Sequence, residues 1–216
     1  LHTCNGNGMK NPLYRAFIEA GGEAGYGVTD DYNGYRQEGM CRMDMTVKNG
    51  VRCSTANAYL KPVLHRSNLT LLMHALTKKV VLEGKKAVGV EFERDGKTHI
   101  VKANREVILS AGSIGSPHIM QMSGMGPSQV LKDAGIEVVH ELPGVGENLN
   151  DHLESVIQYE TKLPVSLNRH MGPIGKFLIG ARWYFFKSGL GATNHFESTG
   201  FIRTRAGLKW PNVQFH

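Results

Sequence analysis

The stretch of residues 107–126 constrains the fold of this chain more than any other. It opens with an uninterrupted apolar run at 107–109, which is typical of a strand buried on both faces of a sheet. Small residues follow at 111–113 and at Gly115 and permit a tight turn, and Ser116 with Pro117 predicts the capped start of a short helix. The stretch therefore predicts a strand, a turn and a helix, the local layout of an α/β protein.

Such a turn presents free backbone N–H groups at the start of a helix, where a phosphate or a sugar can approach the chain closely. A nucleotide cofactor is therefore one interpretation of the stretch. The other is an ordinary connection between a strand and a helix, since small residues are common at such turns. The residues by themselves leave both interpretations open.

Composition excludes several classes of protein. The chain has 216 residues with 41% hydrophobic and 20% charged, which suits one ordinary core or parts of two. The formal net charge is +6, but no long basic block suggests nucleic acid as a partner. No apolar run approaches the roughly 20 residues that span a bilayer. The chain begins at Leu1 without the features of a signal peptide, so we expect an internal piece of a longer protein.

The number and spacing of the cysteines indicate the redox environment of the protein. Cys4, Cys41 and Cys53 are odd in number, and their spacing fits neither a metal site nor a disulfide framework. We therefore predict no metal and a reducing, intracellular location.

The periodicity of apolar residues and the positions of Gly and Pro predict the remaining helices and strands. Helices are expected at 11–24, interrupted by Gly21 and Gly22, at 54–60 before Pro62, at 127–134 and at 174–186. Strands are expected in a four-stranded meander at 69–73, 77–83, 87–93 and 98–102, and also at 136–139 and 155–159. The apolar face of the 174–186 helix either packs in a core or lies on an anionic membrane, because basic residues flank it.

The order of residues in the organising stretch carries a family resemblance. It runs Gly112-Ser113-x-x-Ser116-Pro117-x-Ile119-Met120-x-x-Ser123-Gly124-Met125-Gly126. At every fixed position this resembles the second signature of the glucose-methanol-choline (GMC) family of flavin-dependent alcohol oxidoreductases. The likeness extends to residues 31–39, 142–149 and Asp151-His152, and within the family it is greatest to members that oxidise choline.

The resemblance implies an α/β and α+β fold that forms part of a two-domain flavoprotein. Residues 1–66 would be a connecting and substrate-side segment, 67–150 part of an FAD-binding Rossmann-like domain, and 151–216 part of an antiparallel-sheet substrate domain. Family members also carry a Gly-x-Gly-x-x-Gly turn and a catalytic histidine segment that this chain lacks. The residues Asn5-Gly6-Asn7-Gly8 are interpreted only as a turn.

The resemblance also assigns candidate site residues. FAD would contact Thr77, Ala111, Gly112 and Ser113. Glu154 aligns with an acidic residue that faces the trimethylammonium group of choline, Phe196 with an aromatic wall of the same pocket, and His216 with a histidine near the substrate hydroxyl. A carboxylate and aromatic faces are the groups that can hold a quaternary ammonium, which has no hydrogen to donate.

The expected function is oxidation of choline to betaine aldehyde by hydride transfer to flavin, in the synthesis of glycine betaine, with a quinone as electron acceptor. Peripheral attachment to a bacterial or mitochondrial inner membrane and a homo-oligomeric state are compatible with the resemblance. Two alternatives remain: another primary alcohol as substrate, and a non-catalytic module that lacks the cofactor clamp and the base.

Overall fold

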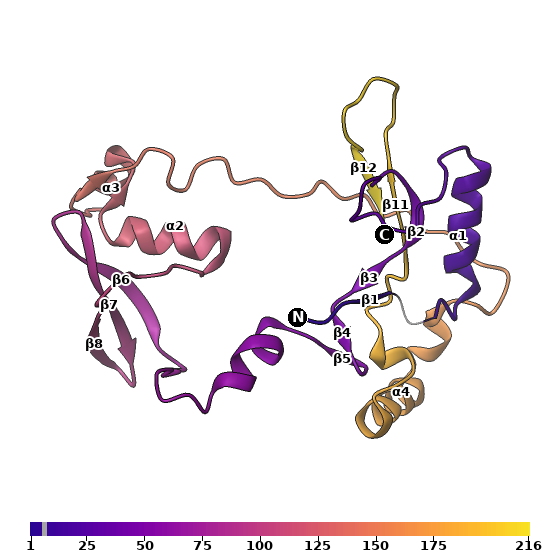
Figure 1. Cartoon of the computed structure of the whole chain (residues 1–216), viewed down its shortest axis with the longest axis horizontal. Coiled ribbons are helices and arrows are strands. Elements are labelled where there is room, and N and C mark those ends of the chain that lie inside the picture. Colours follow the sequence, from indigo (N-terminus) through magenta and orange to yellow (C-terminus); the bar gives the residue numbers. More distant parts are fainter. Residues whose placement is uncertain (6–7) are drawn as a thin grey trace. The chain divides into compact units, whose positions relative to one another are not determined.

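The computed structural model describes residues 1–5 and 8–216, which form two compact units (Figure 1). Unit 1 combines Leu1–Leu69 with Gln158–His216, and unit 2 consists of Thr70–Ile157. The domain limits expected at residues 66 and 150 stay predictions. Of the turn predicted at residues 5–8, Gly6 and Asn7 lie outside the described residues.

The centre of unit 1 is a three-stranded antiparallel sheet in the order β12-β11-β2. Its strands are β2 (Gly39–Arg42), β11 (Ser198–Ile202) and β12 (Val213–Phe215), and Gly200 of β11 pairs with both Met40 and Phe215. The central strand is almost wholly buried, and Thr199 has no exposed surface. Segments from both ends of the chain thus meet in one sheet.

Helix α1 (Pro12–Glu23) packs against this sheet (Figure 1). Asn11 caps it by accepting a hydrogen bond from the Leu13 N–H, and Pro12 occupies the first helical position, as the sequence predicted. The predicted interruption at Gly21 and Gly22 is wrong, because the helix continues to Glu23. A Cβ atom on Gly21 would collide with the Met40 side chain, so this glycine allows close packing rather than ending the helix.

Smaller elements complete unit 1. Two strand pairs are β1 (Cys4–Asn5) with β3 (Asp44–Met45) and β4 (Val47–Lys48) with β5 (Val51–Arg52). The helix predicted at 54–60 is a π-helical turn, η1 (Ala56–Leu60). This turn ends at Leu60, before Pro62, as the sequence predicted, and the 3₁₀ turn η2 (Lys61–Val63) follows directly, with the proline in its first turn, where no N–H is needed. Two further 3₁₀ turns are η3 (Leu167–His170) and η4 (Leu190–Ala192).

Helix α4 (Pro173–Phe186) ends where the sequence predicted and begins one residue before the predicted start at 174. Its inner side is fixed by Trp183, whose Nε1–H donates to the Gly50 carbonyl oxygen at 2.8 Å. Its predicted core face is exposed, however: Ile174, Phe177 and Phe185 each keep more than 70% of their surface. Within the described residues the core interpretation of this face is therefore wrong, since no element covers it.

Unit 2 contains an antiparallel meander of three strands, β6 (Leu76–Glu83), β7 (Lys86–Arg94) and β8 (Lys97–Lys102). The chain turns at 84–85 and 95–96, between the predicted strands, and Asp95 and Gly96 both have positive φ, as a two-residue hairpin turn of this type requires. The fourth strand, predicted at 69–73, is absent from the described residues, and its apolar side chains at 71–73 are exposed. An apolar run becomes a strand only where another strand pairs with it.

Helix α2 (Gly112–Met122) packs against β6. The Val80 N–H of β6 donates to Ser123 Oγ at 2.8 Å, and Gly124 follows with φ +80° as the glycine that ends the helix. The predicted N-cap at Ser116 is wrong: the N-cap is Ala111, five residues earlier, and the helix begins at Gly112. Ser116 instead stabilises that start from within, because its Oγ accepts a hydrogen bond from the Ala111 N–H at 2.9 Å.

The rest of unit 2 consists of β9 (Met125–Gly126), α3 (Ser128–Asp133) and β10 (His140–Glu141), with β10 parallel to β9 and Leu131 buried beneath them. Helix α3 agrees with the prediction at 127–134. The strand predicted at 136–139 is wrong and lies instead at 140–141.

Two further predicted strands are wrong. Residues 107–109 form no strand, and Ile108 keeps 76% of its surface, because no described segment pairs with this run. Residues 155–159 are extended, unpaired and exposed for the same reason.

Candidate functional site

The start of α2 forms the first candidate region, in unit 2. Gly112 has φ +85°, a conformation that L side chains rarely adopt, and a Cβ atom there would meet no other atom within 4 Å. The backbone is therefore turned and uncovered at the point where the first N–H groups of the helix point outward. This is the geometry that accepts a phosphate or a hydroxyl of a nucleotide.

A groove of about 700 Å³ runs along the same helix. It is lined by α2, including Ser113, Pro117 and Gln121, and by the loop at 144–150. The Gln121 Nε2–H group donates to the Val145 carbonyl oxygen at 3.2 Å and ties this loop to the helix. Of the predicted cofactor residues, Ser113 lines the groove, and Ala111 and Gly112 lie immediately before it in the chain.

Thr77, the fourth predicted cofactor residue, lies on β6 opposite Phe92 and is half-buried. It belongs to the same unit as the groove but does not line it. Its predicted contact with the adenine of FAD stays a prediction.

The second candidate region lies in unit 1 and contains Phe196 and His216. Their ring centroids are 5.3 Å apart and the rings meet edge to face, at 61°. Phe196 precedes β11 and His216 follows β12, so the antiparallel pairing of these strands brings together two residues predicted separately from the sequence. Phe196 keeps 47% of its surface, which leaves its ring open to a ligand.

A network of hydrogen bonds surrounds this aromatic pair. Glu197 is only 4% exposed, and its carboxylate accepts hydrogen bonds from the Met9 N–H at 2.9 Å and from Thr193 Oγ1 at 3.0 Å. The Tyr14 hydroxyl donates to the His195 carbonyl oxygen at 2.8 Å. Burial, and second the charge of Glu197, raise the pKa of Tyr14, so the hydroxyl keeps its proton and remains a donor.

Sequence reasoning missed Tyr14, Thr193 and the burial of Glu197. A glutamate is usually exposed, and nothing in the spacing of residues 193–197 marks this one as buried. Glu197 directly precedes the almost wholly buried strand β11, and this burial is a property of the folded chain.

Glu154, the predicted partner of the ammonium group, lies in an extended, exposed segment of unit 2. Phe196 and His216 belong to unit 1. The structure thus unites two of the three predicted substrate-side residues, and the place of Glu154 beside them stays a prediction.

The described residues contain no group of three or more His, Cys, Asp or Glu side chains that could hold a metal ion. Nor does any helix in residues 1–5 and 8–216 have the length and apolar character needed to cross a membrane.

The described residues form a mixed α/β fold, and comparison with known proteins gives the family of the chain. The profile described as GMC oxidoreductase matches residues 2–154, so the chain belongs to the GMC oxidoreductase family. It is 60% identical over 215 residues to the oxygen-dependent choline dehydrogenase of Photobacterium profundum, covering 99% of this chain and 38% of that protein. The protein of the same name in Vibrio vulnificus is 57% identical, over 100% of this chain and 39% of that protein.

The chain thus spans well under half the length of the curated relatives it matches. Among solved structures it resembles pyridoxine 4-oxidase from Mesorbium loti, with a TM-score of 0.74 and 27% identity over 93% of this chain and 35% of that one. It also resembles an FAD-dependent oxidoreductase from Chaetomium thermophilum, with a TM-score of 0.71 and 26% identity over 88% of this chain and 34% of that one. Family membership and this likeness imply FAD as the cofactor.

Proposed function

We propose that the protein to which this chain belongs oxidises choline to betaine aldehyde and uses FAD as the hydride acceptor. The observation that carries the proposal is the 60% identity, over 99% of this chain, to a relative named for choline dehydrogenation. The likeness to an oxidase of pyridoxine at 27% identity supports the family's chemistry on alcohols but speaks less to the substrate.

In this proposal unit 2 supplies part of the FAD-binding domain. The backbone N–H groups of Gly112 and Ser113, at the start of α2, hold an oxygen-rich part of the cofactor, and the groove along α2 takes the part of the cofactor next to it. The backbone at Thr77 contacts the adenine. FAD supplies the acceptor for the hydride, and the protein binds it, orients it and excludes water.

Unit 1 supplies part of the antiparallel substrate domain. The half-exposed Phe196 ring offers its face to the trimethylammonium group, an attraction worth about 0.5 to 2 kcal/mol. His216, held against the edge of that ring, lies near the substrate hydroxyl and binds it. Glu154 supplies the negative charge that a neutral alcohol would not need.

The electron acceptor is the second part of the proposal. The relatives' printed name points to dioxygen, whereas our sequence-based expectation is a membrane quinone. The exposed apolar side of α4, with Lys176, Arg182 and Lys187 around it and no acidic residue in the helix, favours contact with an anionic membrane. Comparing oxygen consumption with the reduction of a soluble ubiquinone analogue distinguishes the two acceptors.

The experiment that tests the substrate is anaerobic titration of the full-length flavoenzyme with choline. We expect bleaching of the flavin absorbance with one equivalent of betaine aldehyde formed per flavin. Pyridoxine and benzyl alcohol serve as competitors from the same reaction class. Bleaching by either of them, with none by choline, would favour the alternative of another primary alcohol, and an enzyme that holds no flavin would favour the non-catalytic alternative.

A further inference from the structure

The turn before β11, which positions Phe196, has an unusual backbone conformation. His195 has φ +64°, a left-handed conformation that is uncommon for any residue other than glycine. This conformation directs the chain so that the next residue, Phe196, meets His216 edge to face. A residue held in such a conformation costs free energy, and it persists only where neighbouring groups fix it.

Two hydrogen bonds within the turn fix it locally. The His195 N–H donates to Thr193 Oγ1, and the Phe196 N–H donates to Asn194 Oδ1, each at 3.2 Å. Bonds of this kind, from a backbone N–H to a side chain two residues earlier, replace the partners that a regular strand would offer.

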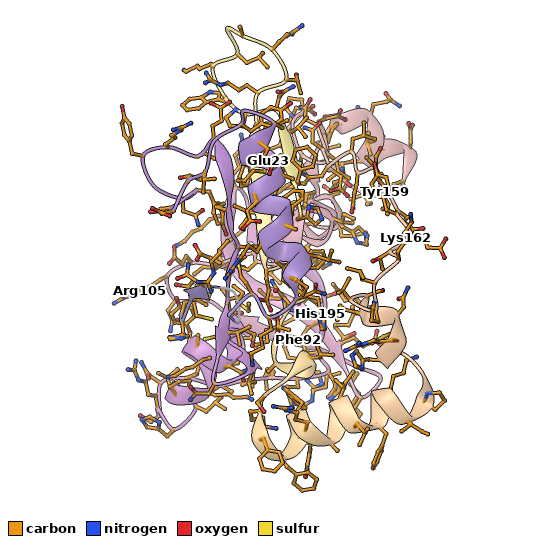
Figure 2. The ribbon with its side chains drawn as sticks, turned by 90° about the vertical axis from the view of Figure 1, so that its right-hand side faces the viewer. Glu23, Phe92, Arg105, Tyr159, Lys162 and His195 are labelled. Carbon is orange, nitrogen blue, oxygen red and sulfur yellow. The ribbon has the colours of Figure 1, made fainter. Side chains whose placement is uncertain are left out.

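Two bonds from other parts of unit 1 fix the turn from outside. The Tyr14 hydroxyl, on the first turn of α1, donates to the His195 carbonyl oxygen. Figure 2 shows Glu23 at one end of α1 and His195 near the other. The buried Glu197 carboxylate joins the Thr193 hydroxyl to the Met9 N–H, so both ends of the turn are tied to the segment that begins α1.

We propose that Tyr14 and Glu197 are positioning residues that hold Phe196 against His216, and that they thereby set the preference for a quaternary ammonium over a neutral alcohol. This inference rests on the proposed function. Neither residue touches the substrate: Tyr14 acts through His195, and Glu197 acts through Thr193. When the turn relaxes, the Phe196 ring leaves its place and the attraction between the ring and the cation weakens.

The test is Tyr14→Phe in the full-length enzyme, because it removes a single hydroxyl and keeps the ring that packs there. Tyr35→Phe is the matched control, since Tyr35 is fully exposed. We expect Tyr14→Phe to lower kcat/KM for choline about 3- to 10-fold, as the loss of one hydrogen bond allows. The value for the uncharged isostere 3,3-dimethylbutanol should change less than twofold, and Tyr35→Phe should change neither.

A double variant shows whether Tyr14 acts through Phe196. In a Phe196→Leu background, adding Tyr14→Phe should change choline turnover less than twofold, because the ring it positions is gone. Multiplicative losses would overturn the proposal, as would equal losses for choline and its isostere. Glu197→Gln, which removes the charge and one acceptor, should follow Tyr14→Phe in direction.

A readout without substrate separates this inference from the proposed function. In enzyme labelled with ¹³C-histidine, the ring signal of His216, identified by its loss in His216→Asn, should move in Phe196→Leu because the Phe196 ring current is removed. The same signal should move in Tyr14→Phe and stay in place in Tyr35→Phe. An unmoved His216 signal in Tyr14→Phe would contradict the positioning role even in an enzyme active on choline, whereas a moved signal in an enzyme inactive on choline would contradict only the proposed function.

Discussion

Replacing Gly112 by alanine should weaken flavin binding through the backbone alone. Gly112 has φ +85°, and the added Cβ would touch nothing within 4 Å, so no clash contributes. A side chain forced into the left-handed region costs about 1–2 kcal/mol. If that strain falls on the conformation that holds the cofactor, the dissociation constant of FAD should rise about 5- to 30-fold. Flavin content after gel filtration and titration of the apoenzyme with FAD measure this directly.

Gly135 provides the matched control. It also has positive φ, +70°, and an added Cβ there would likewise meet nothing within 4 Å, but it ends α3 and does not line the groove. Gly135→Ala should therefore lose similar stability and keep its flavin. The reasoning is refuted if Gly112→Ala binds FAD as the unmodified enzyme does, or if Gly135→Ala loses flavin to the same extent.

Three other outcomes are expected. Glu154→Gln should weaken choline binding by about 2 to 5 kcal/mol, the usual cost of removing one member of a desolvated charge pair, and leave 3,3-dimethylbutanol unaffected; equal loss for both ligands would argue against the role of Glu154. Burial, and secondly the charges of nearby aspartates, raise the pKa of Cys41 from 9.0 to about 11. At pH 8 the thiolate fraction of Cys41 is therefore about 0.1%, whereas a thiol with a pKa of 9.0 would be about 9% thiolate. Iodoacetamide labelling followed by peptide mapping should therefore modify the half-exposed Cys4 well before the buried Cys41. Leu131→Ala, at a side chain that is 1% exposed, should cost about 2–5 kcal/mol of unfolding free energy, whereas Val130→Ala, at an exposed neighbour, should cost much less in the same denaturant titration.

Local signals in the sequence predicted the helices better than the strands. The helical spacing of apolar residues at 174–186 predicted α4 to within one residue, because a helix makes its hydrogen bonds within itself. The apolar run at 107–109 cannot form strand hydrogen bonds by itself. Its partners lie elsewhere in a sheet, so composition can indicate a strand that the described residues do not complete.

The candidate site shows the same division. Gly112 was predicted as a cofactor contact from its place in the family signature, and its positive φ fits that role. The contact between Phe196 and His216 depends on strand pairing and on the left-handed His195, which no spacing of residue types announces. The burial of Glu197 is likewise a tertiary property: only the folded chain brings the Met9 N–H to a side chain 188 positions away.

The measurement that tests the account most directly compares kcat/KM of the full-length enzyme for choline and for 3,3-dimethylbutanol. The two molecules share shape and hydroxyl group and differ in charge. A site with a carboxylate and the Phe196 face directed at the ammonium should favour choline by at least tenfold, or about 1.4 kcal/mol. Equal values, or a preference for the neutral alcohol, would contradict choline as the substrate for which this site is built.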